Sequence, residues 1–198
     1  MFQTLFFWGL DGTAAAILLL PIFCLLNNRC FHSRRKTIWY FIFSLYLCAV
    51  YVVAGLPDIR YVRLDFNINL EPFAYMFSDY RSTLLNVLLF LPLGFFLSVL
   101  WTRFRNGFRT VLFGFAMSLT IELLQLFTYR ATDVNDLMTN TTGTALGWIV
   151  GRIALRLIPG LTPEDDTQNV FAVCAITFGV MFFLHPFLAD TLTAFLPL

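Results

Sequence analysis

Charged residues are scarce in this 198-residue chain, and their scarcity argues against a soluble fold. Only 13% of the residues are Asp, Glu, Lys or Arg, about half of the roughly 25% that is usual in soluble domains. Hydrophobic residues make up 59% of the chain, and the mean hydropathy is +0.75. The formal net charge is only +1, so the composition also argues against nucleic acid as a partner. A lipid bilayer is the solvent that this composition predicts.

Cysteine and histidine are too few and too dispersed for a disulfide framework or a typical metal site. The two histidines, His32 and His185, lie far apart in the sequence, so we expect no His-based metal site. The first residues lack the basic segment of a cleaved signal peptide. The cysteines show no paired spacing, and they are Cys24, Cys30, Cys48 and Cys174.

Six apolar stretches are each long enough to cross a membrane, which takes about 20 mostly apolar residues. We therefore predict an all-α, polytopic membrane protein of about six transmembrane helices in one bundle, with residues 1–198 as a single membrane domain. The expected helices are Leu5–Leu26, Thr37–Leu56, Thr83–Trp101, Thr110–Thr128, Leu137–Leu157 and Asn169–Leu184.

The basic residues predict how these helices are oriented, because cytoplasmic loops carry an excess of Lys and Arg. We place the first, third and fifth loops in the cytoplasm and both termini outside. Asp11 and Gly12 interrupt the first helix, and an interfacial first helix would move only the N-terminus inside. The three cytoplasmic loops hold nine of the thirteen basic residues, namely Arg29, Arg34, Arg35, Lys36, Arg103, Arg105, Arg109, Arg152 and Arg156.

Polar side chains from three of the predicted helices converge in the outer leaflet. A helix rises about 1.5 Å per residue, so Glu122 lies roughly 9 Å beneath the outer surface. A carboxylate at the membrane centre costs about 2.5–3.5 kcal/mol, so Glu122 must face protein or a wet cavity rather than lipid. Arg130 and Asp133 lie in the short loop above it. The converging set comprises Asn86, Glu122, Gln125, Asp136 and Asn140.

Each charged residue of this region has a functional and a structural interpretation. Glu122 would accept a proton or a substrate hydroxyl, or it would hold the helices together by hydrogen bonds to nearby amides. Arg130 would bind a phosphate or carboxylate, or it would anchor the loop by pairing with Asp133. Asp133 and Asp136, together with Asn135 and Asn140, would offer oxygen ligands to Mg²⁺ or Ca²⁺. Alternatively, the two aspartates would form an Asx turn in which Asp136 caps the fifth helix.

Small and bending residues predict how the helices pack. Gly143, Gly147 and Gly151 repeat every four residues and would bring the fifth helix close to a neighbour. Pro92 and Gly94 predict a bend in the third helix.

Several of these residues fall in motifs that resemble the VanZ-like family. The resemblance covers a core of about residues 69–151. It begins in the longest connection, residues 58–82, which would either lie on the membrane surface or cover the polar set as a lid. Glu71 departs from the first motif, where an apolar residue is expected, and would add a charge at the mouth of the site or have no role. The motifs NLxPF, NxxxFxPLG, ExxQ, RxxDxxD and NxxGxxxG are carried by Asn69, Leu70, Pro72, Phe73, Asn86, Phe90, Pro92, Leu93, Gly94, Glu122, Gln125, Arg130, Asp133, Asp136, Asn140, Gly143 and Gly147.

The resemblance implies a multi-pass protein of the bacterial inner membrane that contributes to glycopeptide resistance, because the family's namesake is associated with resistance to teicoplanin. Its partners would be membrane lipids and, at the site, a lipid-linked envelope precursor or a lipoglycopeptide. The site would bind or modify that molecule, and whether it is an enzyme stays open. The catalytic residues would be Glu122, Arg130, Asp133 and Asp136, and the substrate-binding residues Asn69, Asn86, Gln125 and Asn140.

Two other functions stay open. In an ion- or proton-coupled transporter Glu122 would be the relay, although the inner half of the fifth helix offers only Arg152 and Arg156 as polar groups. In a non-catalytic membrane scaffold the polar set would be purely structural. We expect no cofactor other than a divalent cation at Asp133 and Asp136.

Overall fold

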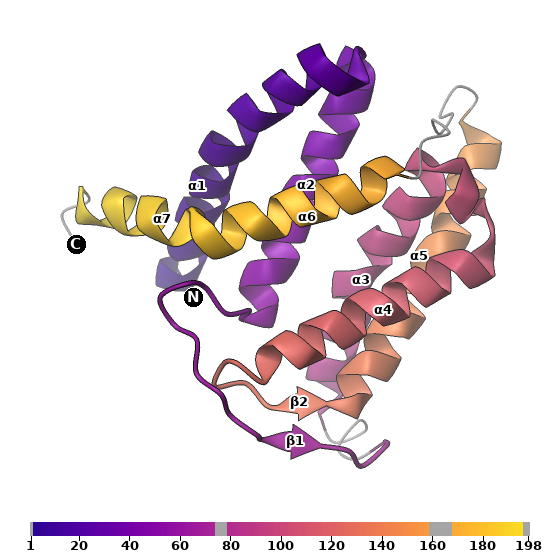
Figure 1. Ribbon diagram of the computed structural model, residues 1–198. Helices are drawn as coiled ribbons and strands as arrows, with labels where there is room; N and C mark the ends of the chain where they lie inside the picture. The colour runs from indigo at the N-terminus through magenta and orange to yellow at the C-terminus, as the bar shows by residue number, and fades with distance from the viewer. Residues whose placement is uncertain (1, 74–78, 159–167, 196–198) are drawn as a thin grey trace. The chain divides into compact units, whose positions relative to one another are not determined.

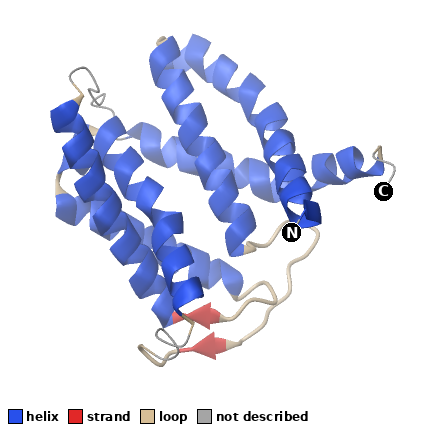
Figure 2. Cartoon of the chain, turned by 180° about the vertical axis from the view of Figure 1, so that it is seen from behind, coloured by secondary structure: helices blue, strands red, loops and turns tan. Residues whose placement is uncertain are grey.

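The computed structural model describes residues 2–73, 79–158 and 168–195, and these are mainly helical (Figure 1). Two strands of two residues each, β1 (Ile68–Asn69) and β2 (Thr132–Asp133), pair with each other (Figure 2). A π-helical turn, η1 (Asn27–Phe31), follows the first helix, and a 3-10 turn, η2 (Thr102–Arg105), follows the third. The predicted all-α class is confirmed. The helices are α1 (Phe2–Leu26), α2 (Arg34–Ala54), α3 (Tyr80–Leu100), α4 (Gly107–Gln125), α5 (Val134–Leu157), α6 (Gln168–Phe183) and α7 (His185–Ala194).

The chain is a multi-pass membrane protein by the length and apolarity of its helices. Within the described residues, four helical stretches could each span a bilayer, and the pair α6–α7, bent by 48°, could form a fifth, broken span. Pro186 lies in the first turn of α7, where its missing N–H costs nothing. α5 is long enough, with 24 residues, but it is not among the helices apolar enough to span a bilayer, so the predicted span Leu137–Leu157 stays a prediction. The four are Gly9–Phe31, Arg34–Ala54, Tyr80–Leu100 and Gly107–Gln125.

Capping residues explain why two helices begin earlier than predicted. Ser33 accepts a hydrogen bond from the N–H of Lys36, so α2 begins at Arg34. Asp133 accepts a bond from the N–H of Asn135, so α5 begins at Val134. The interpretation of Asp136 as the cap of this helix is therefore wrong. Asp136 instead lies in the first turn of α5, where the helix dipole stabilises a negative charge.

The helices divide into two units, residues 1–62 with 168–198, and residues 63–167. In the first unit, α2 and α6 are linked by a buried bond from Thr177 Oγ1 to Ser44 Oγ of 3.0 Å. Nε2 of His185, at the start of α7, lies 3.2 Å from the backbone oxygen of Asp11 in α1. That the whole chain acts as one membrane domain stays a prediction.

In the second unit, glycines let α3 and α5 approach until their backbones touch. A methyl group on Gly147 of α5 would stand 1.9 Å from the backbone oxygen of Leu91 in α3, closer than any side chain tolerates. A methyl group on Gly94 of α3 would stand 2.0 Å from the backbone oxygen of Thr144 in α5. α3 stays helical through Pro92. The glycines that approach the partner helix in this way are Gly94, Gly143, Gly147 and Gly151.

We expect Gly147→Ala to destabilise the protein by about 1–3 kcal/mol, because the two backbones must separate to admit the methyl group. Thermal unfolding of the purified protein in detergent measures the change. Gly179→Ala is the matched control: it lies in α6 and has nothing within 4 Å of the added methyl. Equal unfolding temperatures of the two variants would contradict the close contact.

Candidate functional site

The pairing of β1 with β2 brings the longest connection of the chain against the loop that precedes α5. The strands are parallel, with Ile68 opposite Thr132 and Asn69 opposite Asp133. The N–H of Asp65 also donates to the backbone oxygen of Leu126, just after α4, at 2.8 Å. Residues 63–73 therefore run along the end of the second unit where α4 ends and α5 begins, which favours the lid interpretation for this part. Residues 74–78 of the connection lie outside the described residues.

Glu122 lies beneath this pair of strands and faces protein. Glu122 is 4% exposed, and its Oε2 accepts a hydrogen bond from the N–H of Asp133 at 2.8 Å. Its backbone oxygen accepts a second bond, from Thr132 Oγ1, at 3.0 Å. The last turn of α4 is thus held to β2 both by a carboxylate and by its backbone.

Asp133 uses both of its carboxylate oxygens to hold the loops in place. Oδ1 accepts bonds from the N–H of Asn135 at 2.8 Å and from its side-chain amide at 2.9 Å. Oδ2 accepts a bond from Asn69 Nδ2 at 3.0 Å. Of the predicted residues, Asn69 and Asp133 thus make one contact between the two loops.

Asn135 is a site residue whose role the sequence did not reveal. It is 5% exposed; its Oδ1 accepts a bond from the N–H of Phe73 at 2.6 Å, and its Nδ2 donates to the backbone oxygen of Glu71 at 3.1 Å. Phe73 has a φ of 63°, a conformation that a bulky residue rarely adopts. The only signal in the sequence was an asparagine between two aspartates, which we interpreted as a cation ligand.

The remaining amides connect the three helices of this unit. Asn86 Nδ2 of α3 donates to Asp136 Oδ1 of α5 at 2.5 Å, and Asn140 Nδ2 of α5 donates to Ser118 Oγ of α4 at 3.0 Å. Asn140 Oδ1 is buried and accepts no hydrogen bond from the residues that the structure describes. Gln125 is also buried, with 5% of its side chain exposed. The structure thus brings all five residues of the predicted polar set to the α3–α4–α5 end that holds β1 and β2.

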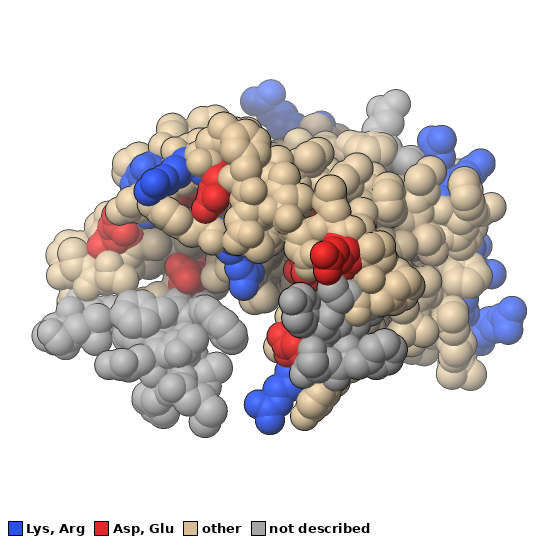
Figure 3. All heavy atoms as spheres, turned by 90° about the horizontal axis from the view of Figure 1, so that it is seen from below, with Lys and Arg blue, Asp and Glu red and all other residues tan. Residues whose placement is uncertain are grey.

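The charges of this cluster are three carboxylates and one guanidinium. Arg130 is exposed and attracts both Glu122 and Asp136 electrostatically, whereas Asp133 repels both of them. Asp133 and Asp136 are half-buried. Charged side chains of both signs reach the surface on the face of the molecule seen from this end (Figure 3).

The donor set does not favour a divalent cation. In the described parts of the chain, no group of three or more His, Cys, Asp or Glu side chains could hold a metal ion. Both oxygens of Asp133 already accept N–H donors, which leaves fewer lone pairs for a cation. The cation at Asp133 and Asp136 therefore stays a hypothesis.

The arrangement offers recognition chemistry at one end of the second unit. Arg130 supplies an exposed positive charge suited to a phosphate or carboxylate. Asp136 and Glu122 supply carboxylate oxygens that could accept bonds from hydroxyl or amine groups. Asp133 is engaged with the protein on both oxygens, so its contribution is to position the surrounding loops.

Comparison with known proteins adds two findings. A family model described as VanZ/LLP1 matches residues 37–155. Protein VanZ of Enterococcus faecium is 38% identical to the chain over 84 residues, which is 41% of this chain and 50% of that protein. The chain thus spans about half the length of this relative. No solved structure matches the chain.

We expect Asn135→Ala to release the turn at residues 71–73, because the N–H of Phe73 then loses its acceptor. Hydrogen exchange at the Phe73 amide should become about tenfold faster, as expected for a lost bond worth about 1.4 kcal/mol. Thr142→Val is the control, since Thr142 is exposed on α5 and bonds only within its own helix at 2.9 Å. Unchanged exchange at Phe73 would show that Asn135 does not hold the turn.

Proposed function

Because the chain belongs to the VanZ/LLP1 family, we propose that its polar cluster binds a lipid-linked or other cell-envelope molecule. The observation that carries this proposal is the convergence of Glu122, Asp136 and Arg130 at one end of the α3–α4–α5 unit, under residues 63–73. Two carboxylates and a guanidinium from separate segments are expensive to bring together within an apolar protein. A ligand that uses their charges would account for their presence.

Each residue of the proposed site has a defined part. Arg130 binds a phosphate or carboxylate of the ligand, and Asp136 and Glu122 accept bonds from its hydroxyl or amine groups. Asn86 holds Asp136 in place through the bond of 2.5 Å, and Asp133 fixes the loops. If the ligand is also modified, general acid–base catalysis by Glu122 is the natural class of reaction.

We also propose the cellular setting. The site faces outward from the bacterial inner membrane, since the first, third and fifth loops carry most of the basic residues. An outward-facing site that binds an envelope molecule would alter what a glycopeptide or lipoglycopeptide antibiotic meets outside the membrane. The protein would thereby contribute to resistance to teicoplanin-type antibiotics.

A membrane scaffold is the second candidate, and one observation favours it. Much of the polar cluster is satisfied internally: Asp133 accepts three bonds, and Asp136 accepts one from Asn86. A cluster that only holds helices together would have this character. The two functions predict different effects when a carboxylate charge is removed: a binding site loses its activity, whereas a scaffold loses its membrane abundance as well.

We expect Glu122→Gln and Asp136→Asn each to abolish the change in glycopeptide and lipoglycopeptide sensitivity while membrane abundance stays within about twofold of wild type. Both replacements keep a carbonyl oxygen that can accept the existing hydrogen bond, so the fold should persist. The assay is made in a host that lacks the native gene, and abundance is measured in the same cells.

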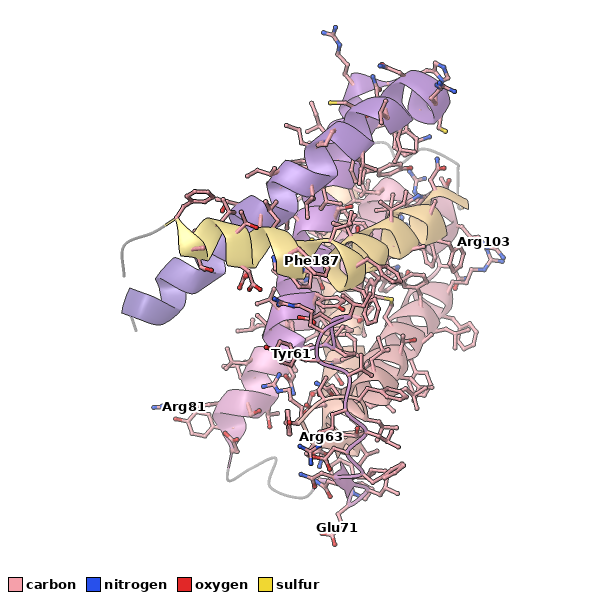
Figure 4. All side chains as sticks on the ribbon, turned by 60° about the vertical axis from the view of Figure 1, so that its left-hand side comes forward. Tyr61, Arg63, Glu71, Arg81, Arg103 and Phe187 are labelled. Atoms are coloured by element: carbon pink, nitrogen blue, oxygen red, sulfur yellow. The ribbon has the colours of Figure 1, made fainter. Side chains whose placement is uncertain are left out.

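Glu71→Gln is the matched control for this assay. It makes the same chemical change on an exposed residue of the connection that contains β1, and the Glu71 side chain projects outward at the end of the unit (Figure 4). Glu71→Gln should therefore behave as wild type. Loss of abundance together with the phenotype in Glu122→Gln would favour the scaffold. A wild-type protein that leaves sensitivity unchanged would remove the resistance role.

The proposed orientation predicts opposite labelling of the two ends of the second unit. Glu71 and Arg103 lie at opposite ends of that unit (Figure 4). In a background with the four native cysteines replaced by serine, Glu71→Cys should react with a membrane-impermeant maleimide in intact spheroplasts. Arg103→Cys should react only after permeabilisation. The reverse pattern would place the site in the cytoplasm.

A further inference from the structure

The first unit holds a groove that the proposed function does not use. It lies between α1 and α2 near η1 and has a volume of about 450 Å³. Apolar side chains, among them Leu20, Phe23 and Phe41, line one part, while Asn27 and Arg34 line another. We propose that this groove binds one anionic phospholipid, with an acyl chain against the apolar part and the phosphodiester at Arg34.

The apolar part is shaped for a hydrocarbon chain. Phe23 is buried and packs edge to face on Phe41, with ring centroids 5.9 Å apart. Leu20 and Ile38 are more than half exposed, at 55% and 58%, and both line the groove. Because α1 and α2 are apolar enough to span a bilayer, lipid chains are the apolar molecules that surround this groove.

The polar part is shaped for a headgroup. Asn27 Oδ1 accepts a bond from Thr37 Oγ1 at 2.9 Å, so the opposite, donating end of the amide is left for other partners. Arg34 supplies a guanidinium, which pairs well with phosphate. A cationic end that continues into an apolar wall matches the chemistry of an anionic phospholipid and not that of a small soluble phosphate.

Neighbouring basic residues strengthen the charge complementarity to an anionic lipid, although they do not line the groove. Nitrogen-bearing side chains gather at the end where α1 meets α2 (Figure 4). Lys36 Nζ lies over the rings of Phe31 and Tyr40, 6.0 and 5.8 Å from their centroids. Arg35 and Lys36 are not among the groove's lining residues. Basic pockets between membrane helices on the cytoplasmic side commonly hold anionic lipid headgroups, and the proposed orientation places this end on that side.

This site is independent of the ligand proposed for the polar cluster, and the two proposals share only the proposed orientation in the membrane. The two residues proposed for the headgroup, Asn27 and Arg34, precede residue 37, where the match to the VanZ/LLP1 model begins. The polar cluster lies in the other unit, on residues 69–140. Failure of one proposal therefore leaves the other standing.

Alkylation of Cys24 tests lipid binding, because Cys24 is exposed and lines the groove. The full chain with Cys30→Ser is placed in nanodiscs of phosphatidylcholine alone or mixed with phosphatidylglycerol, and its reaction with N-ethylmaleimide is followed by mass spectrometry. Phosphatidylglycerol should slow the reaction about fivefold, the effect expected of one basic residue near an anionic headgroup. Arg34→Gln should abolish the slowing, whereas Arg35→Gln, which removes the same charge beside the groove, should retain it.

Cys30 controls for surface charge. It is exposed at the same end but does not line the groove. In a Cys24→Ser chain, the rate at which Cys30 reacts with N-ethylmaleimide should therefore be the same in nanodiscs of either lipid composition. If Cys24 of the otherwise unaltered protein reacts equally fast with and without phosphatidylglycerol, the proposal is overturned. Equal effects of Arg34→Gln and Arg35→Gln would also overturn it, because they would indicate a response to diffuse charge. Protection of Cys24 by inorganic phosphate in phosphatidylcholine alone would overturn it too, because the groove would then bind a soluble anion. The comparison of lipids in the unaltered groove stands even if a variant fails to fold.

Discussion

The contact of α3 with α5 is the constraint on which the rest of the second unit depends. Four glycines bring the two backbones together, and this closeness is what lets the short side chain of Asn86 reach Asp136. Large side chains at the contact would hold the two helices further apart and put this short pair out of reach. The same approach fixes the start of α5, and with it the direction in which Asp133 and Asn135 project. The polar cluster is therefore a consequence of helix packing as much as of its own hydrogen bonds.

At the start of α5, a series of hydrogen bonds holds the loops in place. Asp133 caps the helix and receives Asn69, and its N–H reaches back to Glu122. Asn135 then holds the turn that contains Phe73. The backbone N–H groups of Phe73, Asp133 and Asn135 thereby gain acceptors, as buried backbone groups require. Glu122 thus has a structural task, and any functional task must be compatible with it.

Most of the helices, and the residues of the polar set, could be predicted from the sequence, because apolar length and isolated polar residues are local properties. The strands β1 and β2 could not, since two residues carry no alternating pattern. The predicted sixth helix ends at Leu184, next to the break, but α7 was not predicted, although Pro186 in its first turn favours a new helix there. The start of α5 was missed because Asp133 and Asp136 are equally good caps by residue type. The role of Asn135 depends on Glu71 and Phe73, more than 60 residues away, and no local pattern reports such a partner.

The four residues predicted to be catalytic do not remain equivalent once their contacts are known. Asp133 accepts three bonds from neighbouring amides, so it has less acceptor capacity left for a ligand than Asp136 has. Arg130 is exposed and carries the positive charge that attracts Glu122 and Asp136. Asp136 is half-buried and holds one short bond from Asn86, which leaves further acceptor capacity on its carboxylate. The pair Arg130 and Asp136 therefore offers opposite charges at the surface of the cluster, with Glu122 beneath them, and a ligand with both an anionic group and a hydroxyl or amine would satisfy this pair best.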